Sequence, residues 1–133
     1  MHIAVVSQHR LPVKGYGGTE RIVTALVRGL AELGHRVTLI AQPGTRIAEA
    51  TVREVPAARL RDPKLDLAAL IPKDVDVVHA HLVVERLPDG PPLLQTIHGN
   101  LKHGARVPPH AVFLSRHHAT HHGAATFVYN GLD

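Results

Sequence analysis

The chain has 133 residues, which suits a single domain, and its hydrophobic content of 44% is that of a globular protein with a substantial core. It contains no cysteine, which excludes disulfides and thiolate metal sites, and its net charge of +4 comes mostly from scattered arginines. Aromatic residues make up only 3% of the chain, which argues against a nucleic-acid-binding surface with stacking side chains.

The amino-terminal residues Met1-His2-Ile3 begin directly in a strand pattern and lack the basic region of a signal peptide. No apolar run reaches the ~18 residues that a membrane-spanning helix needs. We therefore expect a cytoplasmic protein. Association with a membrane surface is left open, but nothing in the sequence supports it.

Apolar runs typical of buried strands alternate along the chain with segments of helical periodicity. In chain order they predict strand 3–7, helix 21–33, strands 36–41 and 51–55, helix 63–71, strands 75–80, 93–97 and 111–114, helix 115–122 and strand 126–129. Strands separated by helices predict an α/β fold, because such units form parallel sheets. We expect a Rossmann-like, doubly wound, mainly parallel sheet with helices on both faces and the first strand central.

A glycine-rich segment, Gly15-Tyr16-Gly17-Gly18-Thr19-Glu20, joins the first strand to the first helix. Glycines let a ligand approach the backbone closely, and a helix N-terminus offers free N–H groups to an anion such as a phosphate. We expect Thr19 to cap the helix. The alternative is that the glycines only turn the chain.

A dinucleotide site is disfavoured at this segment. The fingerprint G-x-G-x-x-G needs glycine where the chain has Glu20, and an acidic residue at the end of the second strand, where it has Ala41-Gln42.

Polar residues follow the predicted strands repeatedly, at the edge where open α/β sheets bind ligands. They are Ser7, Gln8 and His9; His79 and His81; His98 and Asn100; Ser115 and Arg116; and Asn130. His81 is expected to face the site and His79 to be buried and hydrogen-bonded. The alternative is that a strand must simply end in something polar.

Four histidines of the predicted helix 115–122 form two pairs at i, i+4 spacing: His117 with His121, and His118 with His122. That spacing can chelate zinc or nickel. No carboxylate or cysteine lies nearby in the sequence to complete a site, so we interpret the cluster as a surface feature.

Several motifs in a fixed order resemble the N-terminal half of a GT-B glycosyltransferase, closest to the large retaining group called group 1 or family 4. They are Gly17–Glu20, Leu33–Leu39, Asp76–His81, Thr96–Gly99, Ser115 and Tyr129–Asp133. The resemblance covers nearly the whole chain. It implies transfer of a hexosyl-type sugar, with retention, from a UDP- or GDP-type nucleotide-sugar to a sugar, lipid or small-molecule acceptor, without cofactor or catalytic metal.

The resemblance also implies roles for individual residues. His98 is the candidate catalytic residue, and donor or acceptor contacts are expected from Gly17, Gly18, His81, Ser115 and Asn130. Arg10 and Lys14, in the first loop, are candidate contacts to an anionic acceptor, although a solvated loop is the slightly favoured interpretation.

The chain departs from the family pattern because no pair of glutamates has Glu-x7-Glu spacing and the segment between His98 and Ser115 is short. We therefore expect residues 1–133 to be a single N-terminal domain that ends at the hinge to a missing nucleotide-sugar domain and is inactive alone. The alternative function is a stand-alone, non-catalytic α/β module that binds a phosphorylated or anionic ligand.

Overall fold

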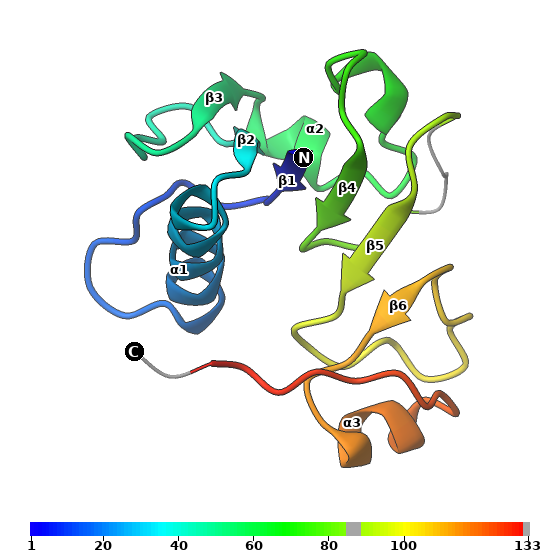
Figure 1. Ribbon diagram of the computed structural model, residues 1–133. Coiled ribbons are helices and arrows are strands. Elements are labelled where there is room, and N and C mark those ends of the chain that lie inside the picture. Colours follow the sequence, from blue (N-terminus) through cyan, green and yellow to red (C-terminus); the bar gives the residue numbers. More distant parts are fainter. Residues whose placement is uncertain (85–88, 132–133) are drawn as a thin grey trace.

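The computed structural model describes residues 1–84 and 89–131, and its centre is a six-stranded sheet in the order β3-β2-β1-β4-β5-β6 (Figure 1). All five neighbouring pairs are parallel, and β1 lies between β2 and β4. The predicted parallel sheet with a central first strand is therefore confirmed. The strands are β1 (His2–Val6), β2 (Arg36–Ala41), β3 (Thr51–Glu54), β4 (Val77–Ala80), β5 (Leu93–Thr96) and β6 (Ala111–Val112).

Helices lie on both faces of the sheet, as predicted, because residues alternate between its two faces. On one face, Val23 and Val27 of α1 (Gly18–Glu32) pack with Val5 and Leu39. On the other face, leucines of α2 (Ala57–Leu60) and of the 3-10 helix η1 (Leu67–Ala69) pack with alternate residues of β1 and β4. The last helix is α3 (Arg116–His121).

The register of the sheet decides which strand residues share the face of α1. Val5 is paired with His79, and His79 with Leu94, so these three side chains lie on that face. Thr96, two residues after Leu94 on β5, is paired with Val112 of β6. The core beneath α1 covers β1 and β2, whereas Leu94 of β5 remains 36% exposed.

Three details of the prediction are wrong. The helix expected over 63–71 is reduced to the 3-10 helix η1, because Asp62 accepts a hydrogen bond from the Lys64 backbone N–H in a turn and Asp66 caps η1 only at residue 67. The strand expected over 126–129 is reduced to one bridge between Phe113 and Phe127. Thr19 does not cap α1, because the helix already begins at Gly18. Leu132 and Asp133, the end of the expected hinge, lie outside the described residues.

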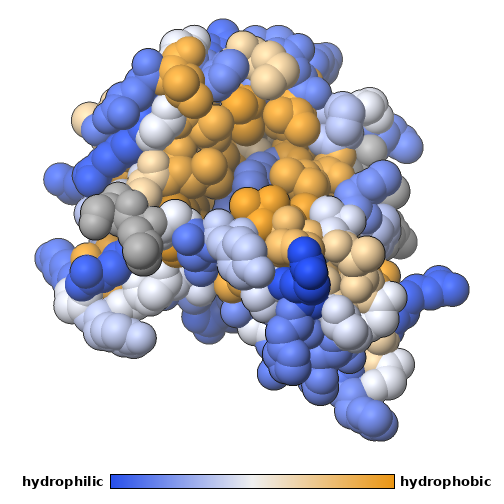
Figure 2. Space-filling model, turned by 60° about the horizontal axis from the view of Figure 1, so that its bottom comes forward, coloured by the Kyte–Doolittle hydropathy of each residue, from blue (hydrophilic) through white to orange (hydrophobic). Residues whose placement is uncertain are grey.

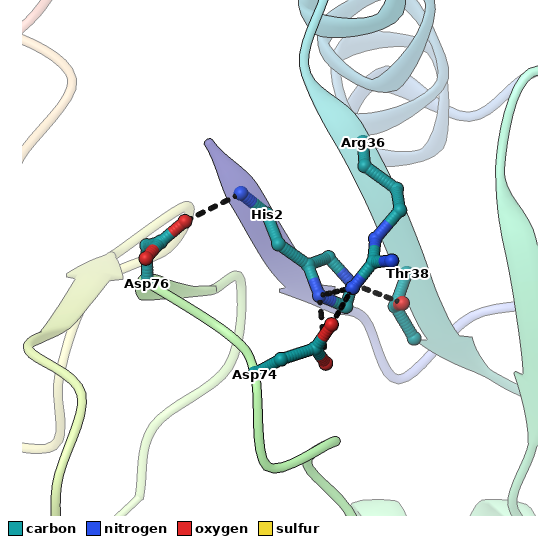
Figure 3. Close-up of polar contacts among 5 residues, drawn as sticks. All are labelled: His2, Arg36, Thr38, Asp74 and Asp76. Carbon is teal, nitrogen blue, oxygen red and sulfur yellow. Dashed lines mark hydrogen bonds and ion pairs between the residues drawn. The ribbon is translucent and has the colours of Figure 1, made fainter.

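A polar cluster ties β4 to β1 and β2 at the amino edge of the sheet (Figure 3). The His2 backbone N–H donates to Asp76 (2.7 Å), and His2 Nε2 lies 2.7 Å from Thr38 Oγ1. Arg36 contacts both His2 Nδ1 and the Asp74 carboxylate. Burial and the Arg36 charge lower the pKa of His2. A neutral His2 therefore holds this edge together, opposite the edge that carries the predicted site.

No helix in the described part of the chain combines the length and apolar character needed to cross a bilayer.

Candidate functional site at the carboxyl edge of the sheet

The glycines before α1 differ in what they do. Gly15 has a φ of 91°, a conformation that side chains disfavour. Gly17 is the N-cap of α1 in extended backbone, and a Cβ there would lie 2.8 Å from Val13 Cγ2 and against the Glu20 carboxylate. A Cβ on Gly18 would meet no described atom within 4 Å. Packing therefore requires glycine at position 17, whereas the fold leaves space for a side chain at position 18.

Glu20 turns back from the first turn of α1 and lies beside the loop that follows β1. Its Oε1 is 3.2 Å from His9 Nδ1, and both side chains are mostly buried. No side chain caps the N-terminus of α1 among the described residues. The space left by Gly17 thus lets a carboxylate orient His9, and the helix N-terminus keeps its partial positive charge.

His81 and His98 form a hydrogen-bonded pair just beyond the neighbouring strands β4 and β5. His81 Nδ1 lies 2.8 Å from His98 Nε2, and the two ring centroids are 5.1 Å apart. His79, two residues earlier on β4, lies with its Nε2 2.7 Å from Thr96 Oγ1, so the expected hydrogen bond is present, but the residue is half-buried rather than buried as predicted. His81 is 4% exposed, so it is itself a buried group behind His98.

Burial keeps these histidines neutral. It lowers the pKa of His79 to about 4, with the His98 charge as a second cause. It also lowers the pKa of His81 to about 2, reinforced by His79 and His98. The pKa of His98 is lowered by burial and by His9. At neutral pH the group therefore offers hydrogen bonds rather than charge.

The unused nitrogen of His81 indicates where the protons lie. His81 Nε2 is buried and has no partner in the part of the chain that the structure describes. A buried N–H without an acceptor is rarer in proteins than an unpaired acceptor, so the favoured tautomer carries its proton on Nδ1 and donates it to His98 Nε2. His98 then carries its own proton on Nδ1 and is a hydrogen-bond donor.

A second pair of histidines holds the backbone beside His98. His118 Nδ1 accepts from the Leu114 N–H (3.3 Å), so its Nε2–H donates to the Gly99 carbonyl (3.0 Å). His122 Nε2 accepts from the Leu101 N–H. These histidines therefore fasten the loop after β5, which corrects their interpretation as a surface feature. No group of three or more metal-ligating side chains occurs within residues 1–84 and 89–131.

The remaining predicted site residues are scattered. The Ser115 side chain accepts from the His118 N–H as the N-cap of α3, a structural contact. Arg10 is exposed and lies over Gly44, and Lys14 is exposed in the same loop. Asn130 is exposed, but it lines one hollow between α1 and the strands β4 to β6 together with the predicted residues Gly18 and His81.

Two hollows meet at His81. The strand-end hollow, of about 320 Å³, combines polar lining from Gln8, Arg61, His98 and Asn100 with apolar lining from Leu82, Ile97 and Leu101. The apolar hollow, of about 740 Å³, lies between α1 and the strands β4 to β6, and Figure 2 shows apolar side chains gathered around this depression. His81 and Thr96 line both hollows.

Sequence reasoning missed the His9–Glu20 pair, the anchoring role of His118 and the contact between His81 and His98. The contact between His81 and His98 could have been expected, because each residue directly follows a predicted strand and the two strands are neighbours in the sheet. The other two depend on how loops fold back, which no local pattern reveals.

A parallel α/β sheet with polar groups gathered at its carboxyl edge defines a Rossmann-like domain. Residues 16–132 match the family model Glycosyltransferase Family 4, and the chain belongs to that family. The resemblance predicted from the motifs is therefore confirmed.

A solved structure supports the same assignment. The chain is similar to AviGT4, described as a glycosyltransferase involved in Avilamycin A biosynthesis, with a TM-score of 0.67 and 27% identity. The match covers 99% of this chain and 42% of that structure, so the chain spans less than half of that protein's length. No curated protein matches the sequence.

Proposed function

We propose that this chain is the N-terminal domain of a two-domain glycosyltransferase that moves a hexosyl-type sugar, with retention, from a UDP- or GDP-type nucleotide-sugar to an acceptor in the cytoplasm. The observation that carries the proposal is that two hollows share His81 and Thr96 as lining, with His98, bonded to His81, lining the strand-end hollow. A transferase needs two substrates brought together at one point, and family membership supports sugar transfer as the reaction.

In this proposal the donor sugar lies in the strand-end hollow. His98 Nδ1–H donates to a sugar hydroxyl or to charge that develops at the sugar, and His81 holds the imidazole in the donating tautomer. Such preorganised donors act in partly buried sites, where they are worth more than in water. Gly17 and Gly18 place the uncapped N-terminus of α1 at the same edge, where it suits a diphosphate.

The proposal is tested by comparing this chain with a longer protein that includes the sequence after Asp133. The longer protein should transfer sugar from a nucleotide-sugar, whereas residues 1–133 alone should not. Weak binding of the nucleotide-sugar by the chain alone is expected, about −4 kcal/mol or millimolar. Robust turnover by the purified 133-residue chain, with contaminants excluded by mass spectrometry, would contradict the two-domain proposal.

A non-catalytic module for an anionic ligand is the second candidate, and the uncapped N-terminus of α1 is the observation that favours it. A stop codon directly after Asp133, together with tight binding of a phosphorylated compound by the chain alone, would support this candidate over the transferase.

A further inference from the structure

The loop after β5 forms one wall of the strand-end hollow and is attached to α3 by two histidines. Gly99, Asn100 and Leu101 line that hollow, and α3 lies at the end of the domain beyond β6 (Figure 1). His118 Nε2–H donates to the Gly99 carbonyl (3.0 Å), and His122 Nε2 accepts from the Leu101 backbone N–H (3.3 Å). One carbonyl and one N–H group of the loop are therefore held by imidazole rings.

The two contacts respond differently to protonation of the rings. The contact of His118 to Gly99 is made by a ring N–H, which a protonated imidazole keeps, and this ring gives up only its contact to the Leu114 N–H. The contact of His122 needs the lone pair of a neutral Nε2, and a protonated ring would present an N–H to the Leu101 N–H instead. Acid therefore removes the contact to Leu101 and leaves the contact to Gly99.

The surroundings of His122 contain no negative charge that could offset its protonation. Between residues 90 and 132 the sequence has no Asp or Glu, whereas seven of the twelve histidines fall between residues 98 and 122. The permanent positive charges of this segment are Lys102, Arg106 and Arg116. As histidines become charged in acid, the loop and α3 therefore repel each other, which adds to the loss of the hydrogen bond.

The rings that face His122 belong to Phe113, His118 and His121, whose centroids lie 4.9–5.6 Å from its own. On the side of the loop, Lys102 and His103 directly follow Leu101. Burial, and then the charges of His121 and His118, lower the pKa of His122 from its ordinary value of 6.5. His122 is therefore neutral, and able to accept the hydrogen bond, at pH 7.

We propose that the loop after β5 is a pH-sensitive element of the strand-end hollow. In mild acid, protonated His122 releases Leu101 and the hollow opens on that side, while His118 keeps Gly99, next to His98, in place. Histidine suits such an element because its charge changes between about pH 5 and pH 8. The release needs no ligand and does not rest on the proposed function.

The test is amide hydrogen exchange of the 133-residue chain, followed by NMR at pH 7.5 and pH 5.0 and corrected for the intrinsic exchange rate. The protection of the Leu101 N–H should fall about tenfold more in the unmodified chain than in His122→Gln, which is the worth of one hydrogen bond. The glutamine amide oxygen can accept from Leu101 and does not titrate. Acid destabilisation of the whole fold acts on both chains and cancels in the comparison.

Two further variants and one titration complete the test. His122→Phe keeps a ring against Phe113 but offers no acceptor, so Leu101 should already be poorly protected at pH 7.5. His117→Gln, at an exposed position of α3, should behave as the unmodified chain does. In a pH titration, the Leu101 amide resonance should move with the midpoint of the His122 ring. The Ile97 amide, which donates to the Val112 carbonyl, should not follow that midpoint.

Three results would overturn the proposal. They are an equal acid loss of Leu101 protection in the unmodified chain and in His122→Gln, full protection of Leu101 at pH 7.5 in His122→Phe, and a Leu101 resonance that does not follow the His122 titration. If His122→Gln does not fold, the phenylalanine variant and the titration of the unmodified chain decide.

Discussion

Acid should destabilise this fold because His79 and His81 are buried in the neutral form. Their pKa values are lowered from 6.5 to about 4 and about 2, so below pH 6.5 the unfolded chain binds protons that the folded chain does not. Stability is therefore complete above pH 6.5 and falls as the pH drops from there toward the folded pKa values.

The magnitude follows from the two pKa values of each group. Between pH 7.5 and pH 5.5, a histidine with an unfolded pKa of 6.5 that stays neutral in the fold contributes a loss of roughly 1 kcal/mol. The two residues together account for roughly 2–3 kcal/mol, and the lowered pKa values of His2 and His98 act in the same direction. This is a large share of a typical folding free energy of about 5–15 kcal/mol.

Urea unfolding followed by circular dichroism at the two pH values measures the effect. His79→Gln should reduce the loss of stability between pH 7.5 and pH 5.5 by roughly 1 kcal/mol, because a neutral amide replaces the titrating ring. The exposed His117→Gln should leave the loss unchanged. If both variants keep the full pH dependence of the unmodified chain, the buried neutral histidines are not its cause.

Two further predictions separate fold from function at the same edge. Gly17→Ala should lower the folding stability by roughly 1–3 kcal/mol, because the methyl group would press on Val13 and the Glu20 carboxylate. Gly18→Ala should leave the stability equal or higher, because nothing obstructs a methyl group there. Thermal melts of the two variants measure both effects. A clear loss at Gly18 would contradict the open space there. His118→Ala should speed amide hydrogen exchange at residues 99–101 and lower stability by about 1 kcal/mol per lost bond, whereas unchanged exchange would mean that the bond to Gly99 does not hold the loop.

The sheet was predictable because its strands are short apolar runs between glycine, proline and polar residues. The β2 strand was predicted with its observed bounds, and the central position of β1 followed from the apolar run Ile3–Val6. The region after β3 was not predictable from periodicity. There, the leucines at helical spacing form only the short helix η1, because Asp62 stabilises a turn and Asp66 starts η1 as its N-cap.

The candidate site was predictable in outline but not in its contacts. Residues after strands were expected to gather at one edge, and His81 and His98 do so. Their hydrogen bond depends on the order and register of β4 and β5, which the sequence does not state. The polar cluster of His2 at the amino edge also went unpredicted, because Arg36 and Asp74 reach it only through the folded sheet.

The most direct test of the central claim is the kinetics of His98→Ala in the two-domain protein, with His117→Ala as the control. Because His98 is held by His81 as a hydrogen-bond donor at the sugar, we expect kcat/KM to fall at least about tenfold, since such donors typically contribute about 10²–10³. The protein should stay folded, with a modestly lower thermal melt because the buried His81 loses its hydrogen-bond partner. The exposed His117 should be neutral in both measurements. Wild-type kinetics for both variants would contradict a sugar-transfer site at this edge of the sheet.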